Sequence, residues 1–280
     1  MGRKTGGAEP CLDHNRNKGV KMEGKQKNPV LFVGAGPGDP ELITVKGMKA
    51  LQEADLIIYA GSLVPEKVLA WARPETRKIN SAGLDLETIV FEMVDAHGKG
   101  KKVVRLHTGD PGLYGAIQEQ IAELERERIP FKIIPGVTAA FAAAAAMGQE
   151  FTIPEISQSL IFTRVAGRTP VPEDESLEKL ASHKTSMAIY LSVSKVEEVC
   201  SILGKCYGKT APAVVAYRVS QPEEKIIRTS IGDMADRIGK ENIKDHAIII
   251  VGKFLDASVK DLKKKSKLYD RNFSHKYRKP

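Results

Sequence analysis

Three short segments of this 280-residue chain combine glycines with small polar residues, a composition typical of loops that bind a ligand. The segments span residues 34–40, 107–115 and 135–140. A glycine has no Cβ, so a ligand can approach its main chain closely. Thr108, Asp110 and Thr138 lie beside these glycines and can supply hydrogen bonds. The three segments therefore predict a binding site for a small polar ligand.

The first segment resembles a dinucleotide-binding fingerprint but departs from it at the decisive positions. The fingerprint G-x-G-x-x-G requires glycine where this chain has Asp39. Pro37 lacks the amide hydrogen that a pyrophosphate-binding loop offers. The acidic residue expected at the end of the second strand is missing, because Asp55 stands at the start of that strand. We therefore expect no NAD site, and a plain structural turn is the alternative interpretation of this loop alone.

Short apolar runs alternate with amphipathic stretches and predict the elements that position these segments. Strands are expected at residues 30–33, 56–59, 77–79, 102–106 and 131–134, with helices at 41–53, 85–97 and 114–127. This order predicts a largely parallel sheet with crossover helices. Each glycine segment follows a strand, at the edge of an open α/β sheet where ligands usually bind. The Ala-rich stretch from Val137 to Met147 is expected to form a buried helix.

A second series of strands predicts a second α/β domain. The strands are expected at residues 160–164, 187–191, 213–217, 225–229 and 247–251. A Ser-Gln-Pro-Glu turn between the third and fourth of these predicts an antiparallel hairpin, so the second sheet is expected to be mixed. Pro154 interrupts the helical pattern after Gly148. We therefore predict domains at residues 29–148 and 149–255.

The positive charge of the chain lies in its two terminal segments. Residues 1–27 carry a net charge of +4 and residues 260–280 carry +7, so the residues between them hold −3 of the total +8. We predict a disordered extension over residues 1–28 and a basic tail over residues 256–280. A mildly acidic body argues against binding of nucleic acid, which requires a basic surface on the folded domain. No apolar stretch is long enough to span a bilayer, and no membrane partner is expected.

The cysteines favour a cytoplasmic protein without a structural metal. Cys11, Cys200 and Cys206 are odd in number and form no C-x-x-C pair, which suits a reducing compartment. Cys11 and His14 have no second pair of ligands nearby in the sequence. We therefore predict no metal site.

The three glycine segments, in this order, resemble the signature of the tetrapyrrole methyltransferase family over residues 29–254. Four segments indicate the branch within the family. They are Tyr59-Ala60-Gly61-Ser62-Leu63, Leu106-His107-Thr108-Gly109-Asp110-Pro111, Phe151-Thr152-Ile153-Pro154 and the stretch from Thr163 to Pro170. Within the family, they are most similar to the branch that methylates carbon 11 of cobalt-precorrin-4, a precursor of cobalamin. The resemblance implies two α/β domains, S-adenosylmethionine bound in the cleft between them, a tetrapyrrole substrate and a homodimer.

The resemblance also implies which residues contact the cofactor. By matched position they are Pro37, Thr108, Gly109, Asp110, Leu113, Thr138, Ala139, Leu191, Tyr217 and Arg218. The stretch from Ala247 to Gly252 is expected to close the site.

Substrate contacts are expected from arginines, because tetrapyrrole precursors carry many carboxylates. Arg164 and Arg168 are the favoured candidates, ahead of Arg105 and Arg218. His107 is a candidate for proton transfer, although a histidine at a strand end is more often packed or hydrogen-bonded. No catalytic acid or base is assigned.

Two departures separate this chain from the uroporphyrinogen methylases of the same family. Those relatives typically have an Asp-Arg pair after the second strand and Gly-Gly-Asp-Pro in the second loop. This chain has Gly61-Ser62 and Thr108-Gly109-Asp110-Pro111 at these places. Uroporphyrinogen III methylation and diphthine synthesis stay open as alternatives in the same fold. A non-enzymatic module that binds a nucleotide-like ligand is the alternative of a different class.

Overall fold

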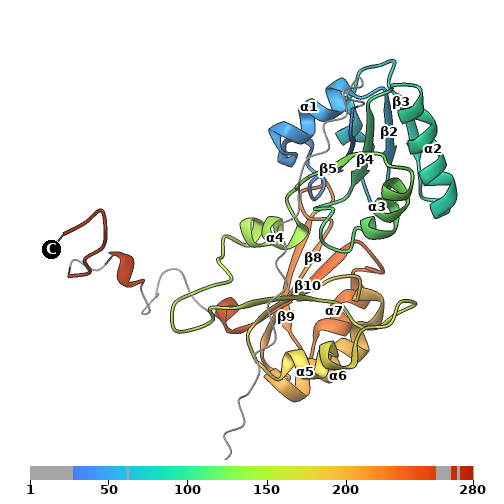
Figure 1. Ribbon diagram of the computed structural model, residues 1–280. Helices are drawn as coiled ribbons and strands as arrows, with labels where there is room; N and C mark the ends of the chain where they lie inside the picture. Colours follow the sequence, from blue (N-terminus) through green and yellow to red (C-terminus); the bar gives the residue numbers. More distant parts are fainter. Residues whose placement is uncertain (1–27, 62, 257–265, 270–271, 280) are drawn as a thin grey trace, which may run out of the picture.

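The computed structural model describes residues 28–279 apart from residues 62, 257–265 and 270–271. Nearly all of the predicted extension over residues 1–28 lies outside the described residues, together with part of the predicted basic tail. The described chain forms two five-stranded sheets, each with its own helices (Figure 1). The two-sheet α/β fold predicted from the sequence is confirmed.

The first sheet is entirely parallel, as predicted. Its strands are β1 (Val30–Gly34), β2 (Leu56–Tyr59), β3 (Arg77–Asn80), β4 (Val103–His107) and β5 (Phe131–Ile134). Their order in the sheet is β3-β2-β4-β1-β5, so β1 and β4 lie in the middle. The loops that leave β1, β4 and β5 therefore emerge side by side at one edge. These are the three glycine segments that the sequence singled out.

Helices cover both faces of the first sheet, which explains its apolar strands. They are α1 (Val45–Glu53), α2 (Leu86–Gly98) and α3 (Ile117–Arg126). Along β1, Val33 belongs to the core that includes α1 residues, whereas Phe32 belongs to the core that includes α2 and α3 residues. The helix expected at 41–53 is interrupted, because a 3-10 turn at Pro40–Leu42 precedes α1 and Thr44 caps the new start by accepting from the Gly47 amide at 3.1 Å.

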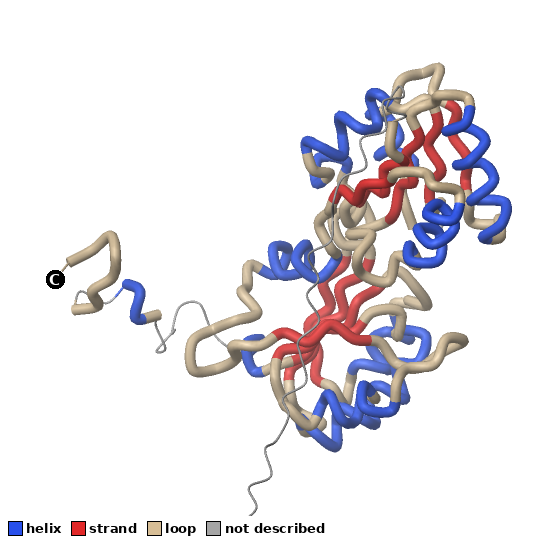
Figure 2. The backbone as a smooth tube through the Cα atoms, viewed as in Figure 1, coloured by secondary structure: helices blue, strands red, loops and turns tan. Residues whose placement is uncertain are grey.

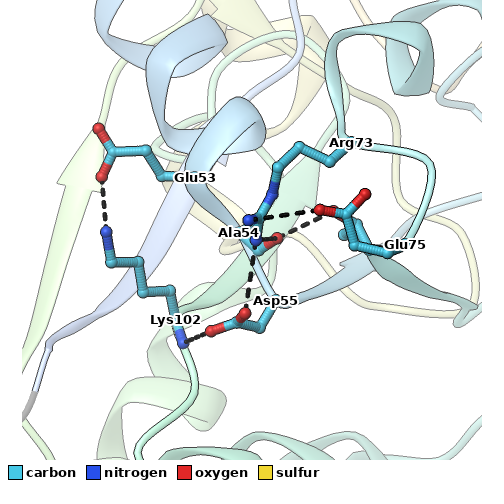
Figure 3. Close-up of polar contacts among 7 residues, drawn as sticks. Glu53, Ala54, Asp55, Arg73, Glu75 and Lys102 are labelled. Carbon is cyan, nitrogen blue, oxygen red and sulfur yellow. Dashed lines mark hydrogen bonds and ion pairs between the residues drawn. The ribbon is translucent and has the colours of Figure 1, made fainter.

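Charged side chains tie together the opposite edge of this sheet, where the strands begin (Figure 3). Asp55 accepts a hydrogen bond from the Lys102 amide at 2.8 Å and one from the Arg73 guanidinium at 3.4 Å. Arg73 also donates to the Ala54 carbonyl at 3.1 Å. The Lys102 ammonium lies 2.8 Å from the Glu53 carboxylate. These contacts link the starts of β2 and β4 through side chains that are largely exposed.

The second sheet is mixed, also as predicted. Its strands are β6 (Leu160–Thr163), β7 (Ser186–Ile189), β8 (Pro212–Tyr217), β9 (Lys225–Ser230) and β10 (Ala247–Val251), in the order β6-β7-β10-β8-β9. Only β6 and β7 pair in parallel, and β8 and β9 form the predicted antiparallel hairpin. Three helices pack on one face: α5 (Leu177–Ala181), α6 (Val196–Tyr207) and α7 (Met234–Lys240).

Helix α4 (Ala139–Met147) covers the other face of the second sheet, although it follows β5 of the first (Figure 2). Its buried residues Ala140 and Ala143 share a core with Ala188 and Val214 of that sheet. Alanine side chains allow this close approach of helix and sheet. The domain boundary at residue 148, which lies after α4, stays a prediction, and the packing groups α4 with the second sheet.

Short 3-10 turns complete the described elements. Besides Pro40–Leu42, they lie at Glu66–Trp71, Glu173–Glu175, Val193–Lys195, Lys253–Asp256 and Lys267–Tyr269. Among the described residues, none of the helices combines the length and the apolar character needed to cross a membrane.

Candidate functional site

Three glycines at the ends of β1, β4 and β5 touch through their backbones. A Cβ on Gly34 would lie 2.6 Å from the Gly109 oxygen and 2.6 Å from the Gly136 Cα. A Cβ on Gly136 would lie 2.1 Å from the Gly109 oxygen. Gly36 and Gly109 also exchange two backbone hydrogen bonds, at 3.3 and 2.8 Å. The three loops therefore pack into one surface, and there is no room for a side chain on Gly34 or Gly136.

Asp110 binds two of these loops together. Its Oδ1 accepts from the Gly112 amide at 2.7 Å, within its own loop. Its Oδ2 accepts from the Gly136 amide at 2.8 Å, in the loop that follows β5. The carboxylate is held in one orientation, because each of its oxygens accepts a backbone hydrogen bond. Asp110 therefore positions the loops that a ligand would contact.

The start of α4 is held by a residue that the sequence analysis did not select. The Tyr190 hydroxyl lies 2.7 Å from the Thr138 Oγ1 and accepts from the Ala140 amide at 3.1 Å. Burial raises the pKa of Tyr190, and its hydrogen bond with Thr138 partly opposes that rise. The only feature of the sequence that could have indicated a role for Tyr190 is its position near the end of the strand predicted at residues 187–191. Tyr190 connects the second sheet to the third glycine segment.

The first glycine segment contacts the turn between β8 and β9. The Asp39 amide donates to the Ser220 Oγ at 3.0 Å, and the Gln221 side chain donates to the Pro37 carbonyl at 3.4 Å. A Cβ on Gly38 would lie 2.3 Å from Gln221 Cγ, so glycine is needed for this approach. These contacts join loops about 180 residues apart in sequence, across the two sheets.

A cavity of about 340 Å³ lies where these loops meet the second sheet. This volume falls in the range of small-molecule sites. Nine of the ten predicted cofactor contacts line it: Pro37, Thr108, Gly109, Asp110, Leu113, Thr138, Ala139, Leu191 and Arg218. Ala247 and Ile248, at the start of the stretch that was expected to close the site, also line it.

Tyr217 is the tenth predicted contact, and it does not line the cavity. Its ring packs beside the core under α5, α6 and α7 and lies 5.5 Å from the Arg218 guanidinium carbon. Successive residues of a strand point to opposite faces, which explains why Tyr217 and Arg218 do not both face the ligand.

A larger cavity of about 750 Å³ adjoins the first one. Leu63, Arg218, Gln221 and His246 line both cavities. Residues that follow β2 also line the larger cavity, namely Gly61 and residues 63–67. We call the two spaces the smaller and the larger cavity, and their four shared residues form the seam between them.

Several residues around the seam adopt left-handed backbone conformations that are unusual for residues other than glycine. Their φ angles are +52° at Leu191, +44° at Arg218, +64° at Ser220 and +52° at His246. Such conformations cost about 1 to 3 kcal/mol each and cluster at ligand sites. No sequence signal marks them, because none of these residues is glycine or asparagine.

Acidic and basic side chains also meet at the seam. Asp245 lies in the smaller cavity wall, and its Oδ1 is 2.6 Å from the His246 Nδ1. This hydrogen bond lowers the pKa of Asp245, and burial opposes the effect only in part. Together with Lys244 and Gln221, these residues were not predicted from the sequence.

His107 and Arg105 lie away from both cavities. Burial and the neighbouring Arg105 lower the pKa of His107 to about 3, so its ring is neutral near pH 7. The ring stacks on Phe32 in the core beneath α2 and α3, and its Nε2 has no hydrogen-bond partner among the described residues. Arg105 is buried beside it and donates to Gln120 at 2.9 Å and to the Ile58 carbonyl at 3.2 Å. The packed interpretation of His107 therefore agrees with the structure better than proton transfer.

The two favoured substrate arginines also lie outside the cavity walls. Arg164 donates to the carbonyls of Thr169 at 3.0 Å and Pro170 at 2.9 Å, so its guanidinium holds its own loop. Arg168 is exposed in that loop. Among the described residues, no group of three or more His, Cys, Asp or Glu side chains could hold a metal ion.

Known proteins are similar to this chain in sequence and architecture. A family model for tetrapyrrole (corrin/porphyrin) methylases matches residues 29–235. A cobalt-precorrin-4 C(11)-methyltransferase from Methanocaldococcus jannaschii is 52% identical over 251 residues, which cover 89% of this chain and 96% of that protein. The X-ray structure of a cobalamin biosynthetic enzyme, a cobalt-precorrin-4 methyltransferase, is 46% identical, has a TM-score of 0.79, and matches 81% of this chain and 96% of its own.

A more distant structure was solved with a ligand bound. It is a uroporphyrin-III C-methyltransferase from Thermus thermophilus complexed with S-adenosylhomocysteine. It is 27% identical to this chain, with a TM-score of 0.68, and the match covers 82% of this chain and 99% of the other. Since the family model spans well over half of the sequence and the relatives match over nearly their whole length, the chain belongs to the tetrapyrrole (corrin/porphyrin) methylase family.

Proposed function

We propose that this protein transfers the methyl group of S-adenosylmethionine to carbon 11 of cobalt-precorrin-4. The observation that carries the proposal is a pair of adjoining cavities with four residues in common. Two ligands that must exchange a group need two sites that open onto one another. The 52% identity to the enzyme from Methanocaldococcus jannaschii supports the choice of substrate and ring carbon.

The smaller cavity suits the cofactor. Gly109 offers its backbone to a ligand, and Thr108 adds a hydrogen-bonding side chain to a wall that also contains Leu113 and Ala139. When bound, S-adenosylmethionine supplies a methyl group on an electrophilic sulfonium. Asp110 and Tyr190 would keep the loops around it in place through their four hydrogen bonds.

The larger cavity suits the tetrapyrrole. Its volume of about 750 Å³ is more than that of the smaller cavity, in keeping with the bigger ligand. The chain then contributes mainly by orientation, because holding two reactants in line removes much of the entropic barrier to their reaction. The strained seam residues are fixed where the two ligands would meet. Arg164 and Arg168 as substrate contacts stay predictions.

Methylation of uroporphyrinogen III is the second candidate function. A uroporphyrinogen-III C-methyltransferase from Priestia megaterium is 36% identical over 239 residues. The two enzymes would share the cofactor cavity and differ around the substrate. The loop after β2, which forms part of the larger cavity, is where this chain departs from those relatives, and this favours cobalt-precorrin-4.

Mass spectrometry of an anaerobic reaction tests the proposal. The protein is incubated with S-adenosylmethionine labelled at its methyl carbon and with cobalt-precorrin-4 or uroporphyrinogen III in parallel. We expect one labelled methyl group on cobalt-precorrin-4, at carbon 11 by carbon NMR, with S-adenosylhomocysteine formed in equal amount. Methylation of uroporphyrinogen III alone would support the second candidate. If neither tetrapyrrole is methylated although the cofactor binds, the protein is a non-enzymatic module that binds the cofactor.

We further propose that the protein acts as a cytoplasmic homodimer. Phe141 on α4 is 54% exposed, and its ring contacts Phe151 and Phe162 with centroid separations of 6.3 and 5.9 Å. Aromatic side chains are enriched in protein interfaces, so this exposed ring supports an interface on α4. Sedimentation analysis of the wild type and of Phe141→Ala tests the dimer, and a monomeric wild type would contradict it.

A further inference from the structure

Arg218 differs from the other arginines that the sequence nominated. Arg105 is buried beneath the first sheet, Arg164 is bound to its own loop, and Arg168 is exposed outside both cavities. Arg218 alone of these four lines the cavities, and it lines both. We propose that Arg218 binds a peripheral carboxylate of the tetrapyrrole, rather than the cofactor to which the family resemblance assigned it. This inference rests on the proposed function.

Two contacts place the Arg218 guanidinium toward the larger cavity. Its Nη1 lies 3.7 Å from the Glu223 Oε2, and Glu223 lines the larger cavity without lining the smaller one. The Tyr217 ring lies 5.5 Å from the guanidinium carbon and supports the side chain. At 3.7 Å, the ion pair with Glu223 is longer than a direct hydrogen bond, so Glu223 orients the guanidinium without saturating its donors.

The main chain of Arg218 is held as firmly as its side chain. Its amide donates to the His246 carbonyl at 2.9 Å, and its φ of +44° turns the chain sharply at the end of β8. This strained conformation places the Arg218 side chain at the seam, and its energetic cost is offset elsewhere in the fold. A rigid backbone under a charged group favours recognition of one particular ligand position.

The guanidinium also retains unused donor capacity. Its Nε is buried and has no hydrogen-bond partner among the described residues. A buried donor without a partner is costly, and a ligand acceptor would remove that cost. Guanidinium groups pair with carboxylates through two parallel hydrogen bonds, and the Nε and one terminal nitrogen form such a fork.

Electrostatics favours the substrate over the cofactor as the partner of Arg218. The cofactor carries a single carboxylate beside an ammonium and a sulfonium, so its net charge is positive and an arginine gains less from it than from a strongly anionic ligand. The acetate and propionate groups of a tetrapyrrole are negative and numerous. With its guanidinium toward the larger cavity, Arg218 could hold one of them while the ring faces the seam.

The test separates substrate affinity from cofactor affinity in three variants. Arg218→Ala removes the guanidinium, Arg218→Lys keeps the charge without the fork, and Arg237→Ala removes an exposed arginine of α7 as the matched control. Uroporphyrin III, which carries eight carboxylates, serves as a stable probe. The single tryptophan, Trp71, reports its binding by fluorescence quenching, because its indole donates to the carbonyl of Pro40, a residue of the larger cavity wall.

We expect Arg218→Ala to weaken uroporphyrin III binding, and to raise KM for cobalt-precorrin-4, by about tenfold or more. Arg218→Lys should recover only part of this loss. Affinity for S-adenosylhomocysteine should stay within about twofold in all variants, and Arg237→Ala should match the wild type. If Arg218→Ala loses as much affinity for S-adenosylhomocysteine as for uroporphyrin III, Arg218 belongs to the cofactor site and the inference is wrong. Unchanged uroporphyrin III affinity would also overturn the inference.

The inference and the proposed function can fail separately. A wild-type protein that binds uroporphyrin III through Arg218 but does not methylate cobalt-precorrin-4 would contradict the proposed function alone. If the wild type methylates cobalt-precorrin-4 and the Arg218→Ala variant does so at the same rate at subsaturating substrate, the inference alone is contradicted. Thermal unfolding of each variant confirms that folding is intact, and Arg218→Lys remains informative if Arg218→Ala does not fold.

Discussion

The two edges of the first sheet are built by different means. At the edge where the strands end, Gly34, Gly109 and Gly136 meet backbone to backbone, with contacts that exclude a Cβ on Gly34 or Gly136. At the edge where the strands begin, long charged side chains such as Arg73 and Lys102 make the connections, and they are largely exposed. Backbone contacts at van der Waals distance tolerate no addition of atoms, whereas exposed ion pairs are worth little individually. The ligand edge should therefore be intolerant of substitution and the opposite edge tolerant.

The largest effect is expected for Gly136→Ala. The new Cβ would lie 2.1 Å from the Gly109 oxygen, so one of two backbone segments must move. We expect a loss of about 3 kcal/mol in the free energy of unfolding, together with loss of S-adenosylhomocysteine binding. Denaturant unfolding and calorimetry measure the two quantities. Gly83→Ala is the matched control, because a Cβ there has no atom within 4 Å. Equal stability of the two variants would contradict the packing argument.

The next effect is expected for Asp110→Ala at the same edge. The substitution leaves the amides of Gly112 and Gly136 without their carboxylate acceptor. We expect cofactor affinity to fall by about 1 to 3 kcal/mol, since the loops that surround the ligand lose their link. Calorimetric titration with S-adenosylhomocysteine measures it. An unchanged dissociation constant would mean that Asp110 contributes to folding stability and not to cofactor binding.

A smaller effect, confined to stability, is expected for Asp55→Asn at the opposite edge. Its hydrogen bond with the Lys102 amide is the main cause that lowers the pKa of Asp55. We expect a cost of about 1 kcal/mol in the free energy of unfolding at pH 7, with unchanged affinity for S-adenosylhomocysteine. A weaker cofactor complex in this variant would mean that the two edges are coupled.

The Asp55 contribution should also depend on pH in a definite direction. Because the folded-state pKa lies below that of the unfolded chain, the stabilisation is fully present above the unfolded value near 3.8. It is lost as pH falls through the folded-state pKa. The difference in stability between the wild type and Asp55→Asn should therefore shrink as the pH is lowered below 4 or so, as measured by urea unfolding.

The smallest effect is expected for Lys102→Met. Its ammonium pairs with Glu53 through side chains that are 46% and 64% exposed. Water screens such pairs, and many contribute nothing measurable. The melting temperature should match that of the wild type within error, and the amide of residue 102 should still donate to Asp55. A clear drop in melting temperature would show that this edge is more rigid than its exposure suggests.

The sequence was a good guide to the fold because each half has a regular pattern. The ten strands of the described residues overlap the predicted ranges, and most coincide with apolar runs such as Val30 to Val33 and Ala247 to Val251. Burial of both sheet faces makes these runs conspicuous. The helix expected at 41–53 was wrong at its start, since the cap at Thr44 was not recognised. The association of α4 with the second sheet could not be predicted, because its all-round apolar pattern does not specify a partner.

The sequence was a partial guide to the site for a related reason. Residues in the glycine segments, such as Thr108 and Thr138, were found because glycine marks a close approach of backbone and ligand. Tyr190 and His246 were missed because their contacts join elements distant in sequence. Histidine is a residue type common in proton transfer, but His107 stacks on Phe32, which belongs to the core with α2 and α3 residues. Residue type alone does not reveal the side of a buried strand that faces a ligand.

The central claim is that the converging glycine loops form a site for S-adenosylmethionine and not for a dinucleotide. Calorimetric titration of the wild-type protein with S-adenosylhomocysteine and with NAD, under the same conditions, tests this claim most directly. Pro37 and Asp39 replace features that a dinucleotide requires, and nine predicted cofactor contacts line the smaller cavity. We expect one equivalent of S-adenosylhomocysteine to bind per chain and NAD to give no binding heat. Binding of NAD with comparable affinity, or no binding of S-adenosylhomocysteine, would contradict the account.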